Sequence, residues 1–160
     1  MVRFCWMMLR FAAAGWVGAA SLFIVCAALE ATCPDLDSLA KNTLILLHFP
    51  WYYAFGFVLL VLALASGMVC WLADGRTRRR LTVLSLVLAA ALLLMIADYV
   101  FIYQPMVGML DQPAEARPSS FQRYHDLSMT INACGSLLWL AAAVLACWPT
   151  APDGRQRAQD

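Results

Sequence analysis

Four apolar stretches, each long enough to cross a bilayer, make up most of this 160-residue chain. They cover residues 11–29, 50–72, 81–103 and 121–148. A membrane-spanning helix needs about 20 predominantly apolar residues, and a helix satisfies its own backbone hydrogen bonds inside lipid. The chain is therefore predicted to be an all-α membrane protein. Residues 1–148 are expected to form a four-transmembrane-helix up-down bundle, and residues 149–160 a disordered cytoplasmic tail.

The composition supports a membrane class and excludes several others. The chain is 63% hydrophobic and 13% charged, with a mean hydropathy of +0.72, whereas soluble domains average about 45–50% apolar and about 25% charged residues. A net charge of +1 gives no electrostatic reason to expect nucleic acid. No GxSxG, HExxH or glycine-rich phosphate loop is present, so no catalytic residue is assigned. The expected partner is the lipid bilayer, with a homodimer or a larger membrane complex left open.

Basic residues are distributed unevenly around the four stretches. Eight of them precede the first stretch, separate the second from the third, or follow the fourth, and three lie in the other connections. The eight are Arg3, Arg10, Arg76, Arg78, Arg79, Arg80, Arg155 and Arg157, and the three are Lys41, Arg117 and Arg123. Because cytoplasmic loops carry an excess of Lys and Arg, both termini are predicted to be cytoplasmic, in a bacterial-type inner (plasma) membrane.

Two features near the outer end of the first stretch leave alternatives open. Its 19 residues exceed the usual apolar core of about 7–15 residues in a signal peptide, which favours a retained span over a cleaved one. Cys26 and Cys33 would lie near the outer face, where an oxidising compartment allows a disulfide. The alternative is that all the cysteines are small buried hydrophobic residues.

The connection between the first two stretches, residues 33–49, has helical periodicity of its own. Apolar residues such as Leu36, Leu39 and Leu47 recur at helical spacing, and Ser38, Lys41 and their polar neighbours take the opposite face. This pattern predicts a short amphipathic helix lying flat in the outer interface. Pro50 would then occupy the first turn of the next span, and the Trp51-Tyr52-Tyr53 sequence would belong to the aromatic belt.

The only two histidines, His48 and His125, are predicted to lie at the same depth. Each lies 23 residues before a tryptophan, Trp71 or Trp148, at the inner end of its span. A helix of that length covers roughly 35 Å, slightly more than the roughly 30 Å apolar core. Both side chains should therefore lie at the outer rim of the membrane.

Polar residues form a stripe along the outer part of the fourth stretch. His125, Ser128, Met129 and Asn132 are spaced i, i+3, i+4 and i+7, which places them on one helix face. Such a stripe is costly against lipid and is expected to face the bundle, although Ser and Asn also act as interhelical hydrogen-bonding groups. Asp98 of the third stretch should reach the same zone, with Arg123, Tyr52, Tyr53 or a histidine as its partner. Its role is either a structural pairing or a functional one.

Two imidazoles on separate helices suggest two kinds of cofactor. They would hold haem b from opposite sides, or bind copper with Met129 or Met106 as a soft third ligand. The alternative for His48 is a residue that contacts lipid headgroups.

The segment from Phe121 to Asn132 carries a resemblance to a known family. Its F-x-x-x-H-x-x-S-x-x-x-N pattern is similar to an element of the small four-span, transmembrane protein 205-like family, whose function is unknown. The Phe49-Pro50-Trp51-Tyr52-Tyr53 sequence resembles the Phe-Pro-x-Tyr-Tyr start of that family's second span. A more distant resemblance connects the chain to copper-resistance D-type membrane proteins, which implies histidines near one membrane face.

Together these observations predict an integral membrane protein with a polar pocket on its outer side. The pocket would involve His125, His48, Asp98, Ser128, Met129 and Asn132 and would bind haem, copper or a small ligand. The alternative is a structural or assembly subunit of a larger membrane complex, in which small residues such as Gly15 and Ala19 contact another helix.

Overall fold

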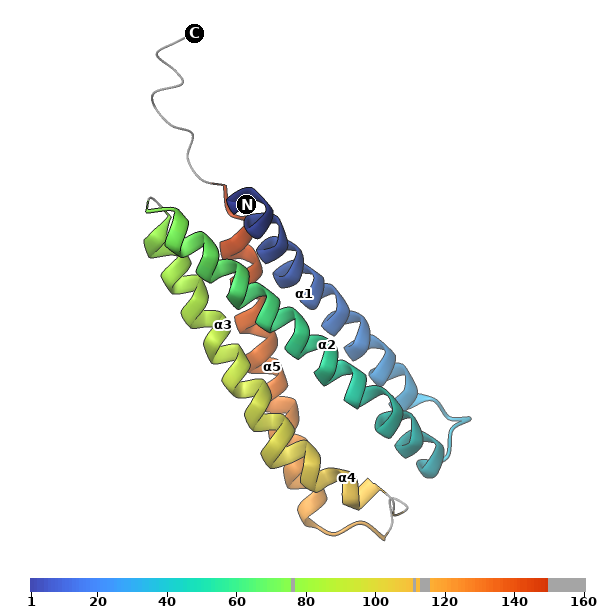
Figure 1. Ribbon diagram of the computed structural model, residues 1–160. Helices are drawn as coiled ribbons and strands as arrows, with labels where there is room; N and C mark the ends of the chain where they lie inside the picture. Colours follow the sequence, from blue (N-terminus) through green and yellow to red (C-terminus); the bar gives the residue numbers. More distant parts are fainter. Residues whose placement is uncertain (76, 111, 113–115, 150–160) are drawn as a thin grey trace, which may run out of the picture.

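A computed structural model describes residues 1–75, 77–110, 112 and 116–149; most of the predicted tail, residues 150–160, lies outside the described residues. The described chain is helical (Figure 1). Its elements are α1 (Val2–Thr32), α2 (Ser38–Ala73), α3 (Arg78–Asp98), the π-helix η1 (Tyr99–Tyr103), α4 (Gln104–Leu110) and α5 (Ser120–Cys147).

The long helices form an antiparallel bundle. Helix α1 packs against α2 and α5, and α3 packs against the same two helices from the other side. The N-terminus, the α2–α3 turn and the end of α5 lie at one end of the bundle (Figure 1). The α1–α2 connection and α4 lie at the opposite end. We name these the Arg80 end and the Lys41 end. The predicted up-down four-helix bundle is confirmed.

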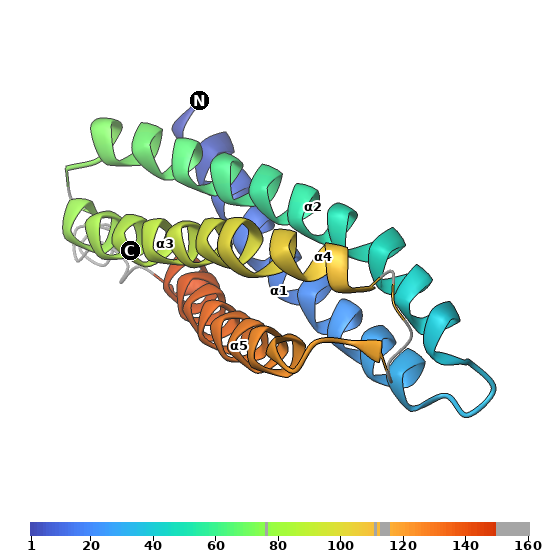
Figure 2. The same cartoon turned by 90° about the horizontal axis from the view of Figure 1, so that it is seen from below.

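Four helical segments are long and apolar enough to cross a membrane, which supports a multi-pass membrane protein. They are Val2–Thr32, Ser38–Ala73, Arg78–Leu110 and Ser120–Cys147, with mean hydropathies of 2.0, 2.4, 2.4 and 1.8. The third combines α3, η1 and α4, which follow one another in nearly the same direction (Figure 2). Large apolar side chains are exposed on every span, as expected for helices whose outer faces contact lipid. Examples are Leu22, Val61, Leu86 and Leu137.

The predicted interfacial helix is helical but is not a separate element. Helix α2 begins at Ser38, and the Asp37 carboxylate caps it by accepting a 2.7 Å hydrogen bond from the Ala40 N–H. The helix then continues through Pro50 without a break. Proline removes one backbone hydrogen bond, which membrane helices tolerate when neighbouring helices hold them in place. The adjacent Phe49 ring lies edge-on against Phe23 of α1, with 5.0 Å between ring centroids. Residues 38–49 are therefore the first turns of α2, and the flat placement was wrong.

The centre of the bundle is packed around Trp16 of α1. This side chain is 3% exposed, and its ring centroid lies 4.9 Å from that of Tyr52 and 5.9 Å from that of Trp139. Gly56 of α2 makes room for it. A Cβ atom at Gly56 would lie 2.7 Å from Trp16 Cη2 and closer still to Met95 Cε, so only glycine permits this approach.

At the Arg80 end, arginines satisfy the carbonyl groups at the end of α5. The Arg80 guanidinium donates hydrogen bonds to the carbonyl oxygens of Leu145 and Ala146, and to that of Trp148 at 2.7 Å. Arg10 Nε also donates to the Ala146 carbonyl, at 3.0 Å. A cation at a helix C-terminus pairs with the orphan carbonyls and with the helix dipole. Arg80 therefore connects α3 to α5 by hydrogen bonds, in addition to its predicted contribution to the membrane orientation of the chain.

Candidate functional site

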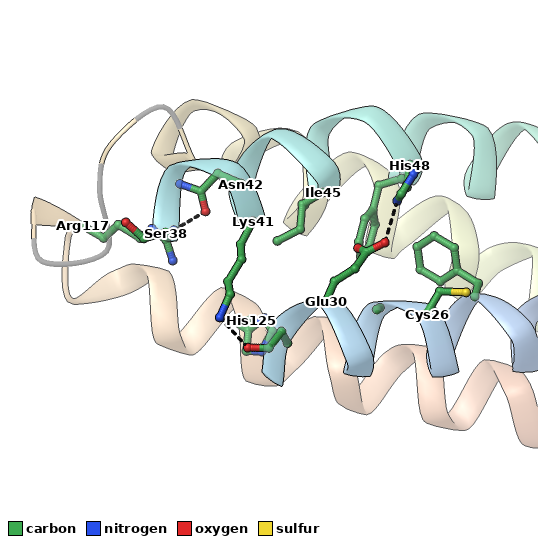
Figure 3. A pocket seen from close by; sticks show the side chains of 13 residues that line it. Cys26, Glu30, Ser38, Lys41, Asn42, Ile45, His48, Arg117 and His125 are labelled. Atoms are coloured by element: carbon green, nitrogen blue, oxygen red, sulfur yellow. Dashed lines mark hydrogen bonds and ion pairs between the residues drawn. The ribbon is translucent and has the colours of Figure 1, made fainter. Parts of the chain in front are cut away.

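A cavity of about 450 Å³ lies between α1, α2 and the start of α5 at the Lys41 end (Figure 3). We call it the histidine pocket because both histidines line it. Its apolar wall consists of Phe23, Cys26, Ala27, Ala31, Ile45 and Phe49. Its polar groups come from Glu30, Ser38, Lys41, Asn42, His48, Arg117 and His125. The volume lies within the range of about 300–1,000 Å³ that is typical of small-molecule sites.

The straight course of α2 explains why this pocket exists. Ser38, Lys41, Asn42, Ile45 and His48 lie at i, i+3, i+4, i+7 and i+10 and so share one helix face. The polar face of residues 38–49 was predicted to meet the membrane surface. It lines the histidine pocket instead, because residues 38–49 continue the span toward α1 and α5.

The charged groups of the pocket are held in different ways. Glu30 Oε1 lies 3.5 Å from His48 Nδ1, an ion pair when the imidazole is protonated. Lys41 Nζ donates a 2.8 Å hydrogen bond to the Ala31 carbonyl. The negative charge of Glu30 is therefore directed to His48, and among the described residues the Lys41 ammonium forms no ion pair and donates to a neutral carbonyl.

Arg117 is the most constrained cation of the pocket. Its Nη2 donates a hydrogen bond to Asn42 Oδ1, and its guanidinium carbon lies 4.5 Å from the centroid of the Phe121 ring. Its Nε is buried and has no hydrogen-bond partner among the described residues. Asn42 is itself 3% exposed and donates to the carbonyl groups of Leu110 and Gln112. Asn42 therefore ties α2 to the connection that carries Arg117.

The sequence argument missed this use of Asn42 and placed the residue on a solvated face. An Asn one turn after Ser38 and directly after Lys41 gives no local signal of burial. Its partners lie 68 and 70 residues further along the chain, so only the folded bundle brings them together.

The two histidines line one pocket, and their predicted common depth in the membrane stays a prediction, but nothing supports a shared metal. His48 pairs with Glu30, whereas the His125 ring stacks on Phe121, with 6.1 Å between centroids. Among the described residues, no group of three or more His, Cys, Asp and Glu side chains is arranged to hold a metal ion. The haem and copper hypotheses therefore gain no support from the geometry.

The predicted stripe on α5 is only partly directed inward. Ser128 is 8% exposed, and Asn132 forms hydrogen bonds inside the bundle. Met129 is 57% exposed and does not line the histidine pocket, so its place beside a ligand stays a prediction. His125 is exposed at the pocket rim. Four residues at this spacing span a wide arc of the helix surface, and only the arc with Ser128 and Asn132 faces α3.

Asp98 is the centre of a second polar cluster. It is 1% exposed, and its Oδ2 accepts hydrogen bonds from the Tyr53 hydroxyl at 2.5 Å and from Asn132 Nδ2 at 2.7 Å. The Tyr52 hydroxyl donates to Asn132 Oδ1 at 3.1 Å, and Asn132 Nδ2 lies 3.2 Å from Ser128 Oγ. We call these five residues the Asp98 cluster. The prediction that Asp98 comes within reach of the α5 stripe is confirmed by its hydrogen bond with Asn132. Tyr53, one of the partners that the sequence suggested for Asp98, also donates a hydrogen bond to it.

Only one of the three residues predicted to belong to the aromatic belt is exposed on the surface of the bundle. Trp51 is 74% exposed, but Tyr53 is 1% exposed and points into the bundle, as does the half-buried Tyr52. Three consecutive helical residues point in directions about 100° apart, so they cannot share one environment. The hydroxyl groups of Tyr52 and Tyr53 reach the Asp98 cluster, which Trp51 cannot approach.

An aromatic layer separates the two sites, which sequence reasoning had treated as one. Phe23 and Phe49 line the histidine pocket. Their ring centroids lie 4.4 and 6.2 Å from that of Tyr52, whose hydroxyl belongs to the Asp98 cluster. Phe49 also lies 6.3 Å from Tyr53. The apolar wall of one site therefore packs directly on the tyrosines of the other.

The fold and these two sites define an all-α, multi-pass membrane protein with a pocket at the Lys41 end of the bundle and a polar cluster in its interior. Comparison of the chain with known protein families, with curated proteins and with solved structures finds no match.

Proposed function

We propose that this membrane protein binds a small amphiphile with an anionic head group in the histidine pocket. The observation that carries the proposal is Arg117, whose guanidinium lines the pocket with a buried Nε that has no partner among the described residues. The planar guanidinium matches the geometry of carboxylate and phosphate groups. Unpaired buried donors are costly, so an anion at this position would remove that cost.

The rest of the pocket fits the two halves of such a ligand. Lys41 adds a second positive charge to the lining of the pocket, whereas Glu30, the single acid among the described lining residues, is paired with His48. The wall formed by Phe23, Phe49 and their apolar neighbours suits a hydrocarbon chain. A head group at the cations and a tail on the aromatic wall would satisfy both surfaces.

A competition experiment with photoreactive palmitic acid tests the proposal on the purified full chain in mild detergent. Unlabelled palmitic acid and hexadecyl phosphate should displace the probe, and hexadecanol should not, because the alcohol has the same tail without the charge. Cross-links should map to α1 and the first turns of α2. Equal competition by hexadecanol would show that the pocket does not select an anion and would refute the proposal.

Arginine variants make the test specific to the pocket. Arg117→Gln should weaken palmitate binding about tenfold or more, since a hydrogen bond to a charged group contributes about 1.5–3 kcal/mol. Arg123→Gln is the matched control, because Arg123 is an exposed arginine of the same region that does not line the pocket. Equal effects of the two substitutions would point to general attraction of anions to this end of the protein.

Haem b and copper are not included in the proposed ligand class, because the described side chains form no metal-binding group. A visible absorption spectrum and a metal analysis of the purified protein test this directly. A haem spectrum that disappears in His125→Ala would restore the cofactor hypothesis based on His48 and His125.

We also propose that the protein lies in a bacterial-type inner membrane with the Arg80 end in the cytoplasm. Arg3, Arg10 and residues 78–80 belong to that end, whereas Lys41, Arg117 and Arg123 belong to the other. The positive-inside rule favours this orientation. Single cysteines introduced near residue 3 or residue 79 of a cysteine-free variant should react with a membrane-impermeant reagent only after the membrane is opened.

A second candidate is the role of a structural or assembly subunit. Small residues of α1 supply a specific observation in its favour: no atom lies within 4 Å of the position that a Cβ would take at Gly15 or Gly18. These positions are therefore not used for close packing inside the bundle, and small residues allow a further helix to approach. Gly18→Leu should abolish cross-linked dimers or larger complexes in the membrane if α1 has this role, and should leave palmitate binding unchanged.

The family resemblance stays a proposal of the same kind. The His125, Ser128 and Asn132 pattern supports a relationship to the transmembrane protein 205-like family, and it assigns no reaction to this chain.

A further inference from the structure

The Asp98 carboxylate lies inside the bundle without a counter-charge. No Lys, Arg or His of the described residues forms an ion pair with it. The titratable groups that face it are Tyr52 and Tyr53 of α2, and the side chains that α5 directs toward it are the neutral Asn132 and Ser128. A buried charge requires pairing or coordination. The two hydrogen bonds to Asp98 leave that requirement unmet.

Only one of the two carboxylate oxygens has partners. Oδ2 accepts both hydrogen bonds of Asp98, from Tyr53 and from Asn132. Oδ1 is buried and has no hydrogen-bond partner among the described residues. A positive charge that compensates the carboxylate is therefore expected beside Oδ1.

A small cavity adjoins the carboxylate. Its volume is about 20 Å³, and its oxygen-bearing lining side chains come from Tyr52, Asp98, Asn132 and Ser136. A cavity of this size holds one water-sized particle. Ser136 forms no hydrogen bond with its hydroxyl group among the described residues, so its oxygen is available to a particle in the cavity. Trp16, Met95 and Trp139 contribute apolar side chains to the lining.

The backbone changes its helical form at the same place. Asp98 ends α3, and the π-helix η1 begins at the next residue. Short π-helical segments within α-helices occur frequently at functional sites. Here the change directs Tyr99 and Tyr103 toward Tyr53, with 5.0 and 5.1 Å between ring centroids. These rings pack against the Tyr53 ring, whose hydroxyl group binds Asp98.

We propose that the cavity beside Asp98 is a binding site for a small monovalent cation, Na⁺ being the best fit. Hard cations prefer oxygen ligands, and Asp98 Oδ1 with the oxygens of Ser136, Tyr52 and Asn132 offers a set of that kind. One carboxylate balances one positive charge, whereas a divalent ion would leave an uncompensated charge in the apolar interior. Both Na⁺ and K⁺ fit a cavity that holds one water-sized particle, but the smaller Na⁺ approaches the carboxylate oxygen more closely and is attracted to it more strongly.

Thermal unfolding of the full chain in mild detergent tests the site. The unfolding temperature is measured in NaCl, KCl and choline chloride at equal ionic strength and constant pH. Na⁺ should raise it in a saturable manner, K⁺ should raise it less, and choline should not raise it. Equal effects of the three salts would overturn the proposal, because they would show screening only. A stability that depends on pH and not on Na⁺ would overturn it as well, because a proton would then be the compensating ion.

Two variants locate the effect. Asp98→Asn keeps the shape and a hydrogen-bonding side chain, removes the charge, and should abolish the response to Na⁺. Ser136→Ala should raise the half-maximal Na⁺ concentration several-fold and leave the unfolding temperature in choline chloride nearly unchanged. Ser21→Ala is the matched control, since the Ser21 hydroxyl is exposed and bonds only to the Val17 carbonyl of its own helix. A full Na⁺ response in Asp98→Asn, or an equal loss in Ser21→Ala, would refute the assignment.

Discussion

Replacing Tyr53 by Phe removes one hydroxyl group from the Asp98 cluster and leaves the aromatic packing in place. Tyr53 is 1% exposed, so water cannot replace the 2.5 Å hydrogen bond to Asp98 Oδ2. A hydrogen bond to a charged group contributes about 1.5–3 kcal/mol, although pairs inside membrane proteins average about 0.6 kcal/mol and reach about 1.7 kcal/mol. We expect Tyr53→Phe to lower the free energy of unfolding by about 1.5 kcal/mol.

Tyr52→Phe is the matched control for that substitution. The Tyr52 hydroxyl is bound to the neutral Asn132 at 3.1 Å, and its loss should cost about 0.6 kcal/mol. Both variants are unfolded reversibly in mixed micelles with a rising fraction of sodium dodecyl sulfate, followed by circular dichroism. Equal losses for the two variants would contradict the assignment of a charge-assisted bond to Tyr53.

A double-mutant cycle with Asp98→Asn identifies the partner. In that background, Tyr53→Phe should cost about 0.6 kcal/mol, because the remaining bond would join neutral groups. An unchanged cost of about 1.5 kcal/mol in the Asp98→Asn background would show that the Tyr53 hydroxyl acts through another group.

The remaining predictions concern packing, capping and the α5 stripe. Gly56→Ala should destabilise the bundle by about 1–3 kcal/mol in the same micelle assay, because the added methyl group overlaps Trp16. Gly18→Ala should not destabilise it, because the space around Gly18 is open. Arg80→Gln should cost about 1–2 kcal/mol by removing the cap of α5, with faster hydrogen exchange in the last turns of α5. The exposed Arg79 supplies its control, Arg79→Gln. Met129→Ala, at an exposed position, should change stability by less than about 0.5 kcal/mol and leave palmitate binding unaltered; a larger loss of binding would return this residue to the site.

The sequence by itself determined the architecture of the chain. Apolar segments of bilayer length can form only spanning helices in lipid, and short connections make neighbouring helices antiparallel. The spacing of Ser128 and Asn132 also predicted which side of α5 faces inward, because the helical period fixes relative directions along one helix. The depth argument used the rise per residue of a helix, and both histidines line one pocket at the same end of the bundle.

Tertiary structure alone decided how the polar residues divide into two sites. Helical spacing relates residues on one helix, but it gives no rotation of one helix relative to the next. The rotation of α2 turned Tyr53 toward Asp98 and Trp51 toward lipid, and the absence of a break at Pro50 turned the polar face of residues 38–49 into a pocket wall. Asn42 found its partners across the bundle. Contacts between distant parts of the chain depend on side-chain packing between helices, and no local pattern of residues encodes them.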